Sequence, residues 1–409
     1  MPRHVGCFLV WEAMRHHPLV RADVLRFVCT AALIASGCSA HTLGPDVAVD
    51  SGDQRCATQA VALGTHSHAV AQPTPLGRTL ADTRGWHGRV YFAYGDLEVN
   101  TGPIVISSYE PSSMTWQDHP IVYRDAKTGA LISTDSFATH VIERFIPIGD
   151  SLWAPAGQPD FRPFGAPAAP EYAIGSATHE WREVDIAPDS IHVVDAVERA
   201  PNEVLLTGSG LFHDRGTAPD GPLLAGGYVW RSVGGGPFTQ IFPAFGATAA
   251  DDNVDRSGAP ITGAALNGVA YLDEASAIYS VDGSSMTCCS VQPLGQFLRP
   301  VAFAGRLVFA DLGQLFAFDG TKLTNLAFPL FVSQGRYQGS PQSLSLFQAT
   351  EGRLLAVNEG GDVMVTGDLA TWTCIGKAPA DATSIGSLNG VVYFGGIEGR
   401  IYGFVHASW

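Results

Sequence analysis

The chain has 409 residues, a formal net charge of −15 and only 15% charged residues. This balance argues against nucleic acid as a partner, because phosphate recognition requires a basic face. The 46 glycines and 26 prolines, with short runs rich in Phe, Val, Tyr and Ile, favour many strands joined by turns over long helices. We therefore expect an all-β chain with little helix, and the length is compatible with one large domain behind a tail.

An export signal is predicted in residues 15–40. Three arginines precede an apolar run from Phe27 to Ala35, and small residues follow the run. This run is far shorter than the roughly 20 residues that cross a bilayer, so we expect the segment to be removed or anchored. Residues before Met14 fit no signal pattern, which is compatible with a misplaced start codon.

The end of the signal contains Ala35-Ser36-Gly37-Cys38, which resembles the lipobox of bacterial lipoproteins. The resemblance implies that the Cys38 thiol is acylated and anchors the protein to the cell envelope, so that lipid alone links it to a membrane. Ordinary cleavage after Cys38-Ser39-Ala40 is the alternative and would release a secreted or periplasmic protein. Residues 41–55 are acidic and poor in large apolar side chains, which predicts a flexible tether before a domain at residues 56–409.

The cysteines do not form a zinc motif. None of the seven lies in a CxxC pair. In an exported protein the four beyond the tether can form disulfides, and the alternative is that they are buried free thiols. The sequence does not choose a pairing among Cys56, Cys288, Cys289 and Cys374.

A repeat dominates the rest of the chain. Segments that begin at residues 266, 303, 350 and 388 share one plan, in which short strands alternate with Gly-rich or Asp/Gly turns. Looser copies begin at residues 86, 145 and 199, so seven units are counted. Each unit predicts a four-stranded antiparallel meander, and the spacing brackets the roughly 40–50 residues of a propeller blade.

Blades packed around an axis bury a continuous core, whereas a single meander leaves a face and an edge exposed. The sequence therefore predicts a seven-bladed β-propeller of four-stranded antiparallel blades and, as a single ring, a monomer. A six-bladed ring, with residues 246–262 or an early unit miscounted, is the alternative. The last unit ends after three strands, and residues 57–71 contain alternating runs that can supply the fourth. We expect this N-terminal strand to close the ring.

Several turns between the third and fourth strands share a pattern. They read Ser280-Val281-Asp282-Gly283, Thr366-Gly367-Asp368 before Trp372, Ser232 to Gly235, and Ser176 before Trp181. They resemble degenerate Asp-boxes of sialidase-like propellers, with kelch-like repeats as a looser comparison. The resemblance implies that the aspartate holds its own turn and the aromatic ring packs between blades. It implies nothing about activity, because that family includes hydrolases, lyases and binding proteins.

Long insertions gather at one expected face. They lie between the second and third strands of units one to three (95–103, 155–171 and 208–227) and in two blade crossings (245–260 and 331–343). In a propeller both kinds of loop surround the same mouth of the central channel, so this face is the predicted binding site. The candidate residues are Asp96, Glu98, Asn100, Glu143, Arg144, Asp160, Arg162, His213, Asp214 and Arg215, with Glu143 and Arg144 expected on the first strand of unit two beside His140.

The sequence supports binding more than catalysis. A sialidase-like site needs clustered arginines with a Tyr/Glu pair and an acid, and Arg144, Arg299 and Glu143 suggest only part of it. We expect no cofactor and no metal, although Asp96 with Glu98, or Asp251, Asp252 and Asp255, are weak Ca²⁺ candidates. His66 and His68 alternate as on one strand face, which is a poor metal site. The prediction is a non-catalytic surface protein that binds a protein or glycan, with a carbohydrate-active hydrolase or lyase as the alternative.

Overall fold

A computed structural model describes residues 58–96, 101–124, 128–156, 172–184, 190–213, 223–242, 262–274, 277–283, 285–291, 298–311, 313–331 and 346–405. Everything below concerns these residues. Within them helix is limited to α1 (Ser67–Val70) and the 3-10 turn η2 (Ile397–Gly399), so the prediction of little helix is confirmed. No helix in this part of the chain is long and apolar enough to cross a membrane.

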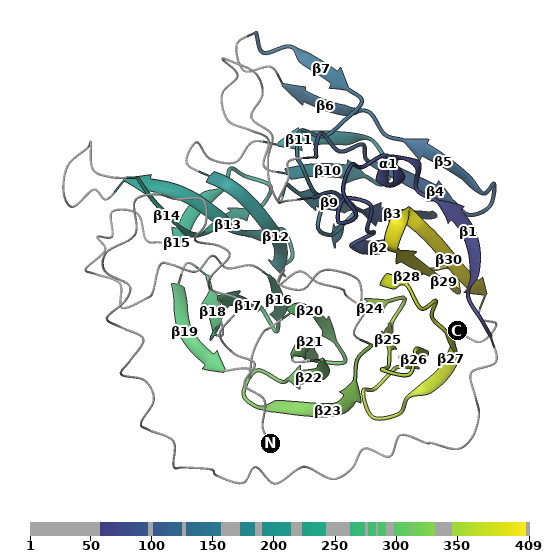
Figure 1. Cartoon of the computed structure of the whole chain (residues 1–409). Coiled ribbons are helices and arrows are strands. Elements are labelled where there is room, and N and C mark those ends of the chain that lie inside the picture. Colours follow the sequence, from purple (N-terminus) through teal and green to yellow (C-terminus); the bar gives the residue numbers. More distant parts are fainter. Residues whose placement is uncertain are drawn as a thin grey trace, which may run out of the picture. The chain divides into compact units, whose positions relative to one another are not determined.

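The strands form seven sheets, which are the blades of a propeller (Figure 1). Blade one contains β2 (Asp82–Trp86), β3 (Arg89–Ala93), β4 (Ser107–Glu110) and β5 (Thr115–Asp118). Blade two contains β8 (Ile146–Ile148), β9 (Ser151–Pro155), β10 (Tyr172–Ser176) and β11 (Trp181–Val184), with β6 (Ile121–Arg124) and β7 (Leu131–Thr134) added. Blade three contains β12 (Ser190–Ala200), β13 (Glu203–His213), β14 (Leu223–Val233) and β15 (Thr239–Phe242).

Blade four contains β16 (Gly263–Leu266), β17 (Val269–Glu274), β18 (Ala277–Asp282) and β19 (Ser285–Val291). Blade five contains β20 (Leu298–Phe303), β21 (Arg306–Asp311), β22 (Gln314–Phe318) and β23 (Leu323–Pro329). Blade six contains β24 (Phe347–Thr350), β25 (Arg353–Val357), β26 (Asp362–Thr366) and β27 (Thr373–Lys377). Blade seven contains β28 (Ala382–Leu388), β29 (Val391–Gly396), β30 (Arg400–Val405) and, as its fourth strand, β1 (Val61–Thr65).

The first strand of each blade faces the axis. These inner strands contact one another in order from β12 through β16, β20, β24 and β28 to β2, and β12 also contacts β8. A hydrogen bond from the Phe145 amide to Asp82 Oδ2 at 2.9 Å joins blades two and one and completes the ring. The buried apolar residues of the described chain divide into six clusters, of which five lie between adjacent blades and the largest spans blades seven, one and two. This radial core confirms the seven-bladed propeller and contradicts the six-bladed alternative.

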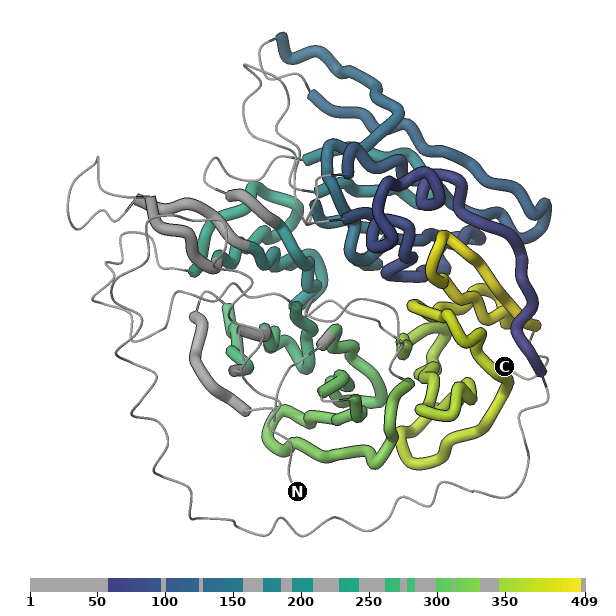
Figure 2. The backbone as a smooth tube through the Cα atoms, in the orientation of Figure 1, coloured from purple at the N-terminus to yellow at the C-terminus, as the bar shows by residue number. Residues whose placement is uncertain are grey.

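The ring is closed by the predicted clasp. β1 pairs antiparallel with β30, with Val61 opposite Gly403 and Thr65 opposite Arg400. The same N-terminal segment reaches blade six, where the Lys377 amide donates to the Thr58 carbonyl at 2.8 Å. Figure 2 shows the purple start of the described chain beside the yellow C-terminal strands. The last sheet is therefore completed by the beginning of the domain.

His66 fixes the other end of this clasp. Its amide donates to the Gly399 carbonyl at 2.8 Å, and its Nδ1 accepts a hydrogen bond from the Ala69 amide at 3.1 Å. Because Nδ1 accepts, the ring proton of the neutral form is on Nε2, which lies 2.9 Å from Ser107 Oγ on blade one. The ring is fully buried. The expectation that His66 and His68 lie on one strand face is wrong, because His66 caps α1 and His68 lies within it.

Two other expectations are corrected. The insertion expected at residues 208–227 is mostly sheet, because β13 continues to His213 and β14 begins at Leu223, so their backbone groups pair with each other. The crossing from blade one to blade two contains a hairpin that sequence reasoning missed. Its strand β6 pairs parallel with β11 and extends blade two to six strands. The available signal was two short runs rich in β-branched residues, 121–123 and 131–134, separated by a turn segment that contains Gly129.

We predict that the clasp weakens in acid. Burial, then neighbouring His68, lower the pKa of His66 to about 3 from 6.5. The His66 ring is therefore protonated more readily in the unfolded chain than in the folded one. The stability that the neutral ring contributes is fully present above pH 6.5 and is lost as the pH falls toward 3. Between about pH 7 and about pH 4.5 the loss is about 3 kcal/mol. Urea unfolding at both pH values measures this loss. In a His66→Gln variant the unfolding free energy should fall by less than in the wild type, and the difference should be about this amount.

Leu63→Ala is the control for this measurement. It weakens the same clasp at a partly exposed apolar side chain that does not titrate. Its pH dependence should therefore match that of the wild type. Parallel pH profiles for His66→Gln and the wild type would contradict the role given to His66.

Candidate functional site

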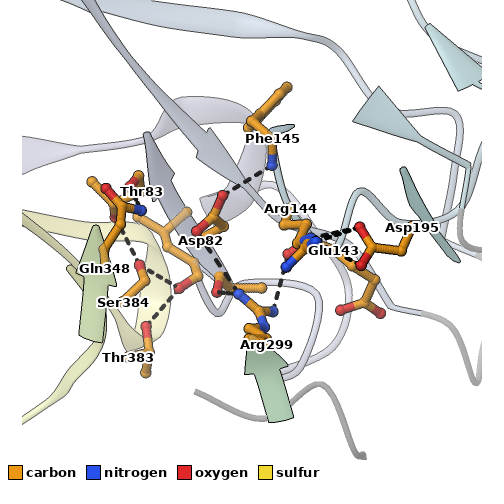
Figure 3. Close-up of polar contacts among 12 residues, drawn as sticks. Asp82, Thr83, Glu143, Arg144, Phe145, Asp195, Arg299, Gln348, Thr383 and Ser384 are labelled. Atoms are coloured by element: carbon orange, nitrogen blue, oxygen red, sulfur yellow. Dashed lines mark hydrogen bonds and ion pairs between the residues drawn. The ribbon is translucent and has the colours of Figure 1, made fainter. Parts of the chain in front are cut away.

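Polar side chains gather where the inner strands begin. Each inner strand is entered from a blade crossing, so its first residues lie at the same end of the ring as the crossings and the loops between second and third strands. We call this end the crossing-loop face. Six charged residues of blades one, two, three and five form what we call the axial cluster, of which Figure 3 labels all but Arg84: Asp82, Arg84, Glu143, Arg144, Asp195 and Arg299.

Arg299 reaches from blade five to blades one and two. Its Nη1 donates to the Ala81 carbonyl and its Nη2 to the Glu143 carbonyl, both at 3.1 Å. Nη1 also lies 3.8 Å from Asp82 Oδ1. Only 5% of Arg299 is exposed, so the guanidinium is removed from water and its charge is shared among these oxygens. The side chain therefore links blades that are not neighbours.

Arg144 and Asp195 form a second link, between blades two and three. Arg144 Nε and Nη2 donate to the two carboxylate oxygens of Asp195 at 2.8 and 2.6 Å. Asp195 is fully buried and also accepts from the amides of Ala196 and Gly263, so the carboxylate joins blade three to blade four. A bidentate pair with additional amide donors is the geometry that compensates for burying a carboxylate.

Hydroxyl and amide groups hold the opposite side of blade one. Thr83 Oγ1 lies 2.7 Å from Ser384 Oγ of blade seven, and Gln348 Nε2 of blade six donates to the Thr83 carbonyl at 2.8 Å. The backbones approach so closely here that a Cβ on Gly386 would lie 2.3 Å from the Thr83 carbonyl oxygen. These bonds give the axial cluster a rigid frame.

Glu143 and Arg84 are the unsatisfied members of the cluster. Glu143 is 5% exposed, and its Oε2 is buried with no hydrogen-bond partner in the described part of the chain. Burial raises its pKa to about 7, although Arg299 opposes the shift. Arg84 Nε is likewise buried and unpartnered among the described residues. Burial lowers the pKa of Arg84, with Asp82 opposing and Arg144 and Arg299 adding to the shift.

This arrangement can receive a polar group more readily than it can perform acid–base chemistry on one. An unsatisfied buried polar atom in a native fold calls for an explanation, and a ligand group that supplies the missing bond is one. Two-carboxylate hydrolysis needs a second available carboxylate beside the acid. In the axial cluster Asp195 is occupied by Arg144 and two amides, and Asp82 accepts from the Phe145 amide.

Three of the ten predicted candidates have described side chains. Glu143 and Arg144 come together in the axial cluster, but they precede β8 instead of lying on it, because β8 begins only at Ile146. Asp96 is buried and accepts from Thr74 Oγ1 at 2.5 Å, while its amide donates to the His140 carbonyl. Asp96 thus ties blade one to the clasp and to the crossing into blade two.

The remaining candidates lie outside what the structure describes. For His213 the backbone belongs to β13, and its side chain is not described. The others outside the described residues are Glu98, Asn100, Asp160, Arg162, Asp214 and Arg215, together with the Ca²⁺ candidates Asp251, Asp252 and Asp255. Sequence reasoning missed Arg84, Asp82 and Asp195, because single charges inside apolar strands carry no motif. Among the described residues no group of three or more His, Cys, Asp or Glu is placed to hold a metal ion.

The aspartate turns have a structural role where they are described. Asp368 Oδ1 accepts from the amides of Ala370 and Thr371 at 2.9 and 2.8 Å, and these bonds lower its pKa. Trp372 packs on Phe328 of blade five with a ring separation of 4.4 Å. The carboxylate holds the turn, and the indole fills the space between blades.

Comparisons with known proteins do not assign a family. The sequence matches no family model and no curated protein. Similar solved structures include YCF48 from Cyanidioschyzon merolae, at 11% identity over 81% of this chain and 97% of that one, with a TM-score of 0.46. The Neurospora crassa Pan2 WD40 domain has 7% identity over 86% and 95%, with a TM-score of 0.48. BamB from Moraxella catarrhalis has 8% identity over 78% and 84%, with a TM-score of 0.37.

We predict that Glu143→Gln stabilises the protein in alkaline but not in acidic solution. The folded pKa of Glu143 lies above its unfolded value of 4.5, so stability present below pH 4.5 is lost as the pH rises through about 7. Near pH 8 the ionised buried carboxylate costs about 3 kcal/mol, and glutamine removes that cost. Thermal unfolding near pH 8 and near pH 5 should show the gain only at the higher pH.

Glu203→Gln is the control, because the same substitution at another buried glutamate should change stability in the opposite direction. Glu203 is also buried, but it accepts from Arg199 and Arg231, and these partners, Arg199 first, lower its pKa. Its stabilising charge is present above pH 4.5, so the glutamine variant should be less stable than the wild type near pH 8. A Glu143→Gln variant that loses stability near pH 8 in the same way would show that Glu143 is paired in solution.

Proposed function

We propose that this protein is a non-catalytic recognition protein that binds a protein or glycan on the crossing-loop face, with a polar group of the partner meeting the axial cluster. The proposal joins the insertion pattern in the sequence with the side chains found beneath that face. The axial cluster supplies polar groups that lack partners among the described residues.

The observation that carries this proposal is the buried Oε2 of Glu143, unpartnered among the described residues, together with the buried Nε of Arg84, which is also unpartnered there; the charge of Arg299 acts on both residues. Leaving such a group unsatisfied costs about 1–3 kcal/mol. A partner that donates to Glu143 or accepts from Arg84 recovers this energy on binding. The cluster is also preorganised, because Arg299, Asp195 and Gln348 fix the blades around it.

The experiment is a binding screen of the purified chain against glycans and cell-envelope proteins, followed by titration of the best ligand with variants. Arg84→Met keeps the length of the side chain and removes its charge. We expect it to weaken binding roughly tenfold, equivalent to about 1.4 kcal/mol. Arg124→Met, at the exposed last position of strand β6, is the matched control and should bind like the wild type. Equal affinity of Arg84→Met and the wild type would remove the axial cluster from the binding site.

We also propose that the protein is exported and tethered through acylated Cys38. The basic residues, the short apolar run and the lipobox-like ending of residues 15–40 support this. In a bacterial host, the wild-type chain should partition into the detergent phase and incorporate labelled fatty acid. Cys38→Ser should do neither, because it removes the acceptor thiol. A wild-type chain that stays in the aqueous phase without label would favour the secreted alternative.

A further inference from the structure

Cys374 is disulfide-bonded, and the bond's other half-cystine lies outside the described side chains. Cys374 lies on β27, the outer strand of blade six, where it packs against the core between blades five and six. Its partner must be one of the six other cysteines of the chain. Identifying that partner decides whether the bond lies within the ring or joins the ring to its N-terminal segment.

The strand register points to the N-terminal segment. The Lys377 amide donates to the Thr58 carbonyl at 2.8 Å, and the Ala60 amide donates to the Lys377 carbonyl at 3.2 Å. This is a parallel bridge that places Gln59 opposite Lys377. The chain before Gln59 and the chain before Lys377 run in the same direction from this bridge, and positions 56 and 374 are each three residues back along them, with one register irregularity of β27 between Gly376 and Cys374. Both positions are cysteines.

The geometry of a parallel pair suits a disulfide. Directly opposite residues on neighbouring strands lie about 4.8 Å apart and project to the same face of the sheet. Disulfides join Cα atoms that are about 4.4–6.8 Å apart. The cysteine that precedes Cys56 is Cys38, 21 residues before Gln59.

The cysteines of blade four are poorly placed. Cys288 and Cys289 belong to β19, the outer strand of that blade. Blade five lies between blade four and blade six, and its apolar side chains fill both interfaces. A disulfide cannot cross a whole blade.

We propose that a disulfide between Cys56 and Cys374 locks the clasp covalently to blade six. Two thiols lose two protons and two electrons as their sulfurs join. The electrons pass by thiol–disulfide exchange to an external disulfide, an oxidised dithiol protein or a small-molecule disulfide, which is released as two thiols. Such oxidants act in export compartments, so the bond would form after translocation. The inference does not depend on the proposed ligand or on the axial cluster.

The direct test is peptide mapping of the full chain, isolated from an oxidising compartment and digested without reduction. We expect a peptide pair that joins Cys56 to Cys374 and separates on reduction. Cys374 joined to Cys288 or Cys289, or recovered as a free thiol, would overturn the proposal. Each of these outcomes is read from masses alone, so it does not depend on how well a variant folds.

A stability measurement tests the role of the bond. The disulfide closes a loop of most of the domain, so reduction should lower the melting temperature by roughly 5–10 °C. Cys56→Ser and Cys374→Ser should each show the lowered value and no further change on reduction. The Cys288→Ser variant is the control and should keep the full reducible shift. A reducible shift that survives in Cys56→Ser would place the bond elsewhere.

Discussion

The pairing of β1 with β30 is the contact on which the rest of this structure depends. Seven sheets arranged around an axis must close on themselves, and β30 of the last blade is far along the sequence from β2 of the first. Here residues from the start of the domain supply the outer strand of blade seven, contact blade six at Lys377 and reach blade one through His66. One segment thus holds three blades, and its loss would expose strand edges and open the ring.

Ring closure also determines the chemistry at the axis. Asp82, Arg144 and Arg299 come from different blades, and they meet only because the inner strands are brought together. Their charges are largely compensated by hydrogen bonds between blades, which makes them structural ties. Glu143 and Arg84 differ, because each keeps a buried polar atom without a partner among the described residues. Such uncompensated groups within a compensated network are typical of a site that exchanges bonds with a ligand.

The fold could be predicted from the sequence, whereas the site could be predicted only in part. The repetition of Gly-rich turns and alternating strands predicts the blades directly. The last unit contains only three strands, which predicts that its fourth strand comes from residues near the N-terminal end of the domain. The axial cluster is different, because its members are single residues such as Arg84 and Asp195 inside unremarkable strands. Their proximity arises from the ring, which no local pattern encodes. Glu143 and Arg144 were found because they were expected on the first strand of unit two, although that strand begins only at Ile146.

Hydrogen exchange followed by mass spectrometry tests the clasp most directly. The backbone amides of Val61–Thr65 should exchange slowly, and they should lose protection together with Arg400–Val405 when denaturant is added, because each strand bonds the other. Rapid exchange throughout Val61–Thr65 beside a protected β30 would contradict the account, since blade seven would then be complete without its N-terminal strand.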